Sequence, residues 1–110
     1  MTTHWLTKRI SQNIQSLVTI NEAVDRLLTI LDSEDKIYLA GMPETRLVDL
    51  HLTLGMAIRN AFKRHDPMNP LLVACSTIHP DDASEVIIHS LWLALQRDFQ
   101  RLQSKLRLTL

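Results

Sequence analysis

An arginine, an asparagine and a histidine near the middle of the chain could together act on a phosphate. Arg59 and Asn60 are adjacent, and His65 follows on the same stretch. A guanidinium stabilises negative charge on a pentavalent phosphate, and a histidine can exchange a proton with a ribose hydroxyl. These residue types are the ones that metal-independent cleavage of RNA needs. The alternative is structural: Arg59 would pair with an acidic side chain, and His65 would lie at an exposed helix end.

A second polar cluster begins at His79 and reads His-Pro-Asp-Asp-Ala-Ser-Glu. Asp81, Glu85 and His89 are four residues apart and would share one helix face, as the ligands of a metal ion could. Three ligands spread over two helical turns are too far apart to hold one ion by themselves. The cluster is also typical of a helix start, because Pro80 suits the first turn and the acids complement the helix dipole. We therefore expect a helix start here, with no metal site and no other cofactor.

The two polar clusters also suit each other. We expect Arg59 to bond the acidic start of the last helix, and Asn60 to hold the loop that follows. Such contacts would form one buried polar network that fixes the packing of two helices. Its members would be Arg59, Asn60, His79, Asp81 and Asp82.

A basic stripe near the end of the chain is the remaining candidate site. Arg97, Arg101 and Lys105 are four residues apart on the last predicted helix. They could touch phosphate or an acidic surface of a partner protein, or they could be solvated and favour the helix dipole. An acidic patch lies toward the other end of the chain, at Asp25, Asp32, Glu34 and Asp35. Opposite patches would allow self-association, with Trp5, Trp92 and Leu110 helping to bury a dimer surface; Trp92 fits the core of the chain equally well.

Composition limits the class of protein. The 110 residues suffice for one domain, residues 1–110, with its own core. Twelve basic residues balance 12 acidic ones, which argues against a uniformly basic nucleic-acid binder, although nucleic acid as a partner stays open. The single cysteine, Cys75, suits a reducing compartment, and the longest apolar run, Leu71–Cys75, is too short to span a bilayer. We expect a cytoplasmic protein without a leader segment or a membrane partner.

Helical periodicity dominates the sequence, so we expect an all-α, single-domain bundle of four or five helices. The capping-box pattern that begins at Thr19 could start a second helix there, or one long helix could run through it. The central pair of helices would be Pro43–Arg64 and Pro80–Leu106. The other predicted helical segments are Trp5–Val18, a following helix to Leu31, Ile37–Ala40 and Leu71–Cys75.

Two resemblances extend these expectations. The pattern Leu-His-Leu-x-Leu-Gly-Met-x-Ile-Arg-Asn-x-Phe from Leu50, followed by His-Pro-Asp-Asp-Ala-Ser from His79, resembles a family of small uncharacterised bacterial proteins. That resemblance implies an all-α fold and no established activity. The segment from Arg59 to His65 resembles the Arg-x4-6-His signature of HEPN ribonuclease-like domains. It implies a metal-independent ribonuclease in which Arg59, Asn60 and His65 act at a cleft between two subunits.

By elimination, we expect a non-enzymatic protein-interaction module that binds a partner protein. The chain shows no evident nucleophile–base pair, set of metal ligands or phosphate-cradling glycine loop, so surface recognition is what is left. An immunity protein, an antitoxin or an inhibitor of a defence system would fit a small neutral helical domain. The alternative function is the HEPN-like ribonuclease.

Overall fold

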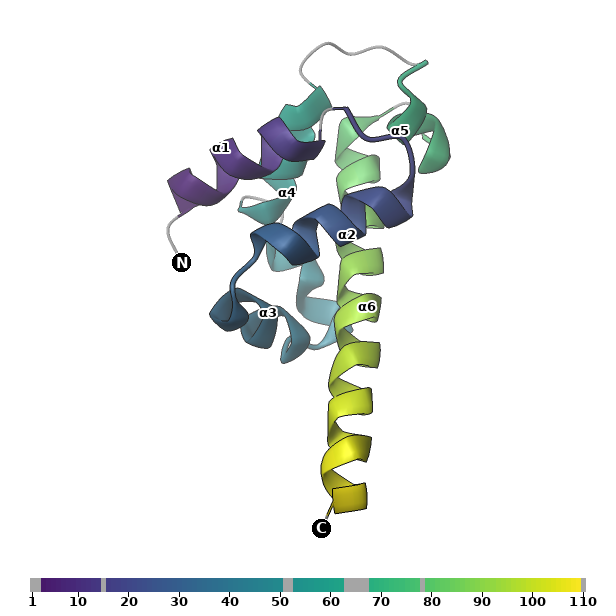
Figure 1. Cartoon of the computed structure of the whole chain (residues 1–110). Coiled ribbons are helices and arrows are strands. Elements are labelled where there is room, and N and C mark those ends of the chain that lie inside the picture. The colour runs from purple at the N-terminus through teal and green to yellow at the C-terminus, as the bar shows by residue number, and fades with distance from the viewer. Residues whose placement is uncertain (1–2, 15, 51–52, 63–67, 78, 110) are drawn as a thin grey trace.

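The computed structural model describes residues 3–14, 16–50, 53–62, 68–77 and 79–109, with side chains except at 3–8 and 106–109. The described residues form six α-helices and two 3-10 helices and contain no strand, which confirms the predicted all-α class. Figure 1 shows the shorter elements gathered around the upper part of one long helix. The elements are α1 (Thr3–Ile14), α2 (Ile20–Ile30), α3 (Ser33–Ala40), η1 (Glu44–Leu50), α4 (Leu54–Arg59), η2 (Asn60–Phe62), α5 (Pro70–Ala74) and α6 (Pro80–Thr109).

Local side-chain caps separate the first three helices. The Thr19 hydroxyl accepts a bond of 3.0 Å from the Glu22 backbone N–H, and the Glu22 carboxylate accepts one of 2.9 Å from the Thr19 N–H. This reciprocal capping box starts α2, so the chain forms two helices here and not one continuous helix. Asp32 then caps α3 by accepting a 2.9 Å bond from the backbone N–H of Asp35.

The single central helix expected over Pro43–Arg64 is wrong, because the segment divides into η1, α4 and η2. The Leu50 carbonyl accepts bonds from both the backbone N–H and the hydroxyl of Thr53, at 3.1 and 3.3 Å. Gly55 lies against this turn: a Cβ added to it would lie 3.2 Å from the Leu50 carbonyl oxygen. The turn lets α4 pack between α1 and α6, which one straight helix could not do. This division also raises the number of helices above the four or five expected.

The first half of α6 is the spine of the core. Elements α2, α3, α4 and η1 all pack against it, and α1 covers α4 and α2. Along α6, Ile87, Leu91 and Leu95 are at most 2% exposed, whereas Leu102 is 54% exposed. The core therefore ends near Leu95, and the remainder of α6 extends past the other helices (Figure 1).

Two side chains fix the other helices to α6 close to the point where the core ends. The Trp92 indole N–H donates to the Met42 carbonyl at 2.9 Å, and the Gln96 amide donates to the Ala40 carbonyl at 2.7 Å. The molecule measures 52 × 27 × 25 Å, and α6 gives it its long axis. Among the described helices, none combines the length and the apolar character that crossing a membrane needs.

Candidate functional site

The structure brings Arg59 and Asp81 together across the contact between α4 and α6. Arg59 Nε lies 3.0 Å from a carboxylate oxygen of Asp81. The arginine side chain is 17% exposed and the aspartate side chain is 67% exposed. A Cβ added to Gly55 would lie 3.5 Å from an Arg59 Nη atom, an ordinary van der Waals contact, so the guanidinium packs directly beside Gly55. This ion pair joins one residue from each of the two polar clusters of the sequence.

The other members of the expected network lie nearer the solvent. Asn60 is half-buried and its backbone N–H donates to the carbonyls of Met56 and Ile58. His79 and Asp82 are exposed, and each has a contact with Thr77. The start of α6 is thus a surface feature, where water solvates its carboxylates, and not the buried position expected from the sequence. A structural role for these residues stays a prediction.

The catalytic alternative depends on His65, which lies outside the described residues. Arg59 already has its Nε bonded to the Asp81 carboxylate. That carboxylate would compete with an incoming phosphate for the same guanidinium, because both are anions that bind it through oxygen. The ribonuclease hypothesis therefore stays a prediction.

Sequence reasoning missed a hydrogen bond between the side chains of His89 and Glu44. Their side chains meet at 3.0 Å, and the His89 ring stacks on Trp92 at 6.2 Å with an angle of 13° between the rings. No local pattern could show this contact, since 45 residues separate the two partners. Among the described residues, no group of three His, Cys, Asp or Glu side chains could hold a metal ion.

A cavity of about 290 Å³ adjoins this pair, between η1 and α6. Ile88, which is 5% exposed, lines the apolar side of the cavity, and the exposed side chain of Glu85 also lines it. The Ser84 hydroxyl donates to the Asp81 backbone carbonyl at 2.8 Å and is 1% exposed, so it is not available as a nucleophile. The arrangement joins η1 to α6 and lacks the nucleophile–base geometry of a hydrolase. The residues that line the cavity are Glu44, Leu47, Val48, Ser84, Glu85, Ile88 and His89.

Two other residues that the sequence singled out serve the core. Trp92 is half-buried, and its indole N–H donates to the backbone carbonyl of Met42 between α3 and η1. The ring therefore packs mainly against its own chain. The side chain of Trp5, the other tryptophan expected at a dimer surface, lies outside the described residues. Cys75 is 6% exposed, and burial raises the pKa of its thiol, which keeps the thiol protonated and unreactive.

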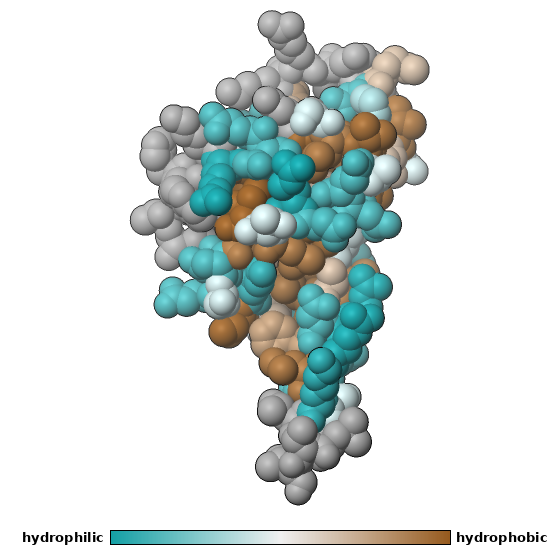
Figure 2. Space-filling view, viewed as in Figure 1, coloured by the Kyte–Doolittle hydropathy of each residue, from teal (hydrophilic) through white to brown (hydrophobic). Residues whose placement is uncertain are grey.

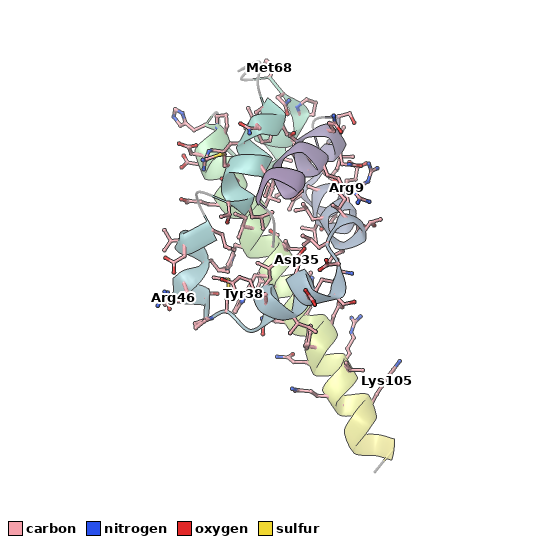
Figure 3. All side chains as sticks on the ribbon, turned by 90° about the vertical axis from the view of Figure 1, so that its left-hand side faces the viewer. Arg9, Asp35, Tyr38, Arg46, Met68 and Lys105 are labelled. Carbon is pink, nitrogen blue, oxygen red and sulfur yellow. The ribbon has the colours of Figure 1, made fainter. Side chains whose placement is uncertain are left out.

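The predicted basic stripe lies on the part of α6 that extends beyond the core. Arg97, Arg101 and Lys105 are all exposed there. Figure 2 shows hydrophobic surface beside hydrophilic surface on this part of the molecule. In Figure 3 the Lys105 side chain points away from the other helices. We call residues 97–109 the projecting end of α6; at 1.5 Å per residue it is about 20 Å long.

Comparison with known proteins places most of the chain in one family. A family model described as a domain of unknown function, DUF6794, matches residues 18–95. No curated protein and no solved structure is significantly similar to the chain. The matched segment contains Arg59, Asp81 and His89 and ends at Leu95, where the core ends, so the projecting end lies beyond it. Because the match covers well over half of the 110 residues, the chain belongs to the DUF6794 family of domains of unknown function.

Proposed function

We propose that the protein is a non-enzymatic protein-interaction module and that the projecting end of α6 is its binding face. The observation that carries the proposal is a continuous apolar stripe on α6. Ile88 and Leu95 are 5% and 2% exposed against the core, and the same helical spacing leads to Phe99 and then to Leu102, which is 54% exposed. An apolar stripe that continues past its own core is available to a second surface.

A helix face of this kind is a common way to recognise another protein. Side chains four and three residues apart, such as Leu95, Phe99 and Leu102, form one seam along a helix. Removing such a seam from water contributes about 25 cal/mol for each Å² of apolar surface buried. The folded core holds the start of α6 in place, so the projecting end is already nucleated as a helix. A partner therefore meets a largely preorganised face.

The proposed class is that of immunity proteins, antitoxins and inhibitors of defence systems, as expected from the sequence. Proteins of this class act by binding and blocking another protein and need no chemistry of their own. The absence of a nucleophile–base arrangement in the described cavity beside His89 supports the non-enzymatic part of the proposal. The projecting end supports the binding part.

A photo-crosslinking amino acid placed at Leu102 tests this proposal in the source cell. The matched control is the same amino acid at Thr29, which is exposed on α2. We expect a defined cross-linked partner from position 102 only, and we expect that partner, once purified, to lose binding to a Leu102→Asp variant. Equal cross-linking from both positions, no cross-link from position 102, or undiminished binding to Leu102→Asp would each overturn the proposal.

A further inference from the structure

We infer that the cavity between η1 and α6 is a binding site for an organic ammonium group carried on an aliphatic chain. The cavity volume of about 290 Å³ is at the small end of the range for ligand sites in proteins, so it suits a small molecule or a single side chain. The cavity lies before the projecting end along α6, and the inference does not depend on the proposed function.

Three apolar side chains line the cavity and can contact an aliphatic chain. Ile88, on α6, is 5% exposed, and Leu47, on η1, is half-buried. Val48, also on η1, is 69% exposed, so a ligand in the cavity would cover part of an apolar side chain that otherwise faces water. Removing this apolar surface from water favours binding of a ligand with an aliphatic part.

Two carboxylates line the same cavity, and among the described residues that line it there is no lysine or arginine. A carboxylate oxygen of Glu44 lies 3.0 Å from His89 Nε2, and Glu85 lies one helical turn before His89, so both carboxylates are neighbours of one imidazole ring. An ionised carboxylate only accepts hydrogen bonds, whereas an ammonium group donates three. Charge complementarity therefore favours a cationic donor and disfavours an anionic ligand.

An organic cation fits this arrangement better than a metal ion does. Among the described residues, no three His, Cys, Asp or Glu side chains are placed to hold a metal ion, so Glu44, Glu85 and His89 do not share one. An ammonium group needs less: it can donate a hydrogen bond to one carboxylate and be attracted by the charge of the other over a longer distance. The apolar lining also has a role for an aliphatic amine and none for a bare ion.

Hexylammonium, 1-hexanol and hexanoate, which share one aliphatic chain and differ in charge, test the inference on the full chain. Two-dimensional NMR follows the methyl signals of Leu47, Val48 and Ile88 and the indole N–H of Trp92, whose ring stacks on His89. We expect saturable shifts with hexylammonium and a dissociation constant on the order of 1 mM, because the ligand has few atoms. Hexanol should bind at least about fivefold more weakly, and hexanoate more weakly still. Equal binding of hexylammonium and hexanol, or no saturable shift, would overturn the inference.

Neutral variants of the two carboxylates provide the matched comparison. Glu85→Gln and Glu44→Gln should each weaken the binding of hexylammonium at least about threefold and leave the binding of hexanol unchanged. Glu34→Gln is the control, since it removes an exposed carboxylate of α3 that does not line the cavity, and it should change neither affinity. All three glutamates are exposed, so the variants should keep the melting temperature of the parent. An equal loss of hexylammonium binding in Glu34→Gln would overturn the inference.

Two further probes identify the source of the ammonium group. A lysine blocked at its backbone amine and carboxyl carries the same group on a side chain. If it binds as tightly as hexylammonium, the ligand is a lysine side chain of another protein; if it binds much more weakly, the ligand is a free amine, and either result agrees with the inference. Zn²⁺ is the other probe. Displacement of hexylammonium by micromolar Zn²⁺ that is lost in Glu85→Gln would identify a metal site and overturn the inference.

Discussion

At the level of single residues, the ion pair between Arg59 and Asp81 shows why burial has to be known before a contact is given an energy. If both partners were buried, loss of the arginine would leave an unpaired carboxylate in the core and cost about 3 kcal/mol or more. Asp81 is instead 67% exposed, so water can solvate it when Arg59 is removed. Arg59 then contributes to stability in two ways: its largely buried aliphatic stem packs against the core, and its guanidinium attracts the Asp81 carboxylate modestly.

We therefore expect Arg59→Ala to lower the free energy of unfolding by about 1 to 2 kcal/mol. Urea denaturation measures this change. Arg46→Ala is the matched control, because Arg46 pairs with Asp49 at 2.8 Å but both side chains are more than half exposed; it should cost about 0.5 kcal/mol or less. A loss of more than about 3 kcal/mol in Arg59→Ala would show that the pair acts as a buried one.

The ribonuclease hypothesis makes a separate prediction at Arg59 and His65. Because Asp81 already bonds the Arg59 guanidinium, we expect no cleavage of RNA by the purified protein. The measurement is a gel assay with a labelled oligonucleotide in the presence of a chelator, which excludes contaminating metal-dependent nucleases. Cleavage that disappears in a His65→Ala variant with unchanged melting temperature would contradict this expectation and favour catalysis.

Asp35 is a buried carboxyl on α3 whose ionisation opposes folding. Asp35 is 7% exposed, and Figure 3 shows its side chain on α3. Burial raises the pKa of the Asp35 carboxyl above its usual value of 3.8, and the nearby charge of Asp32 acts in the same direction. The folded chain thus holds this proton more tightly than the unfolded chain does. The contribution of Asp35 to stability consequently falls as the pH rises from about 4 through the raised pKa.

We expect Asp35→Asn to raise the melting temperature at pH 7 relative to the parent, and this gain to diminish toward pH 4. Melting curves over that range of pH measure the difference. Glu34→Gln is the control, since Glu34 is exposed in the same helical turn, and it should give no comparable gain. If Asp35→Asn raised the melting temperature equally at pH 7 and pH 4, the ionisation of Asp35 would not be the cause of the gain.

At the level of elements, caps could be predicted from the sequence and the break in the central segment could not. The capping box of Thr19 and Glu22 involves residues three apart, so the sequence pattern contains the whole interaction. The turn between Leu50 and Gly55 depends on α4 packing between α1 and α6, which are distant in sequence. Leu50 and Leu54, on the two sides of the break, are four residues apart and both buried. The sequence therefore shows an uninterrupted helical pattern of apolar residues across the break.

Gly55 gives a direct test of that turn. Glycine to alanine inside a helix ordinarily stabilises by up to about 1 kcal/mol. A Cβ at Gly55 would instead lie 3.2 Å from the Leu50 carbonyl oxygen, which Thr53 holds through two hydrogen bonds. We therefore expect Gly55→Ala to destabilise the protein, by about 1 to 3 kcal/mol in urea denaturation.

Gly41→Ala is the comparison for this variant. A Cβ at Gly41 would come no closer than 3.4 Å to its neighbours, and the residue is exposed with φ of −80°, which any residue adopts. We expect a change of about 0.5 kcal/mol or less in either direction. Stabilisation by Gly55→Ala would show that the turn has room to relax.

At the level of the whole molecule, the notable feature is the difference between the compact core and the projecting end of α6. The basic stripe of Arg97, Arg101 and Lys105 could be predicted from helical spacing alone. That it lies beyond the core could not, because the position at which the core ends depends on where α2 and α3 pack against α6. The contact between Glu44 and His89 escaped prediction for the same reason.

The affinity of a Leu102→Asp variant for the purified partner that cross-links at position 102 tests the central claim most directly, with the melting temperature of the variant measured on the same sample. Because Leu102 is more than half exposed, we predict an unchanged melting temperature, within about 1 °C, and a loss of affinity of at least about tenfold. A fall of several degrees would show that Leu102 serves the fold of the chain. Undiminished affinity would show that the projecting end of α6 is not the binding face.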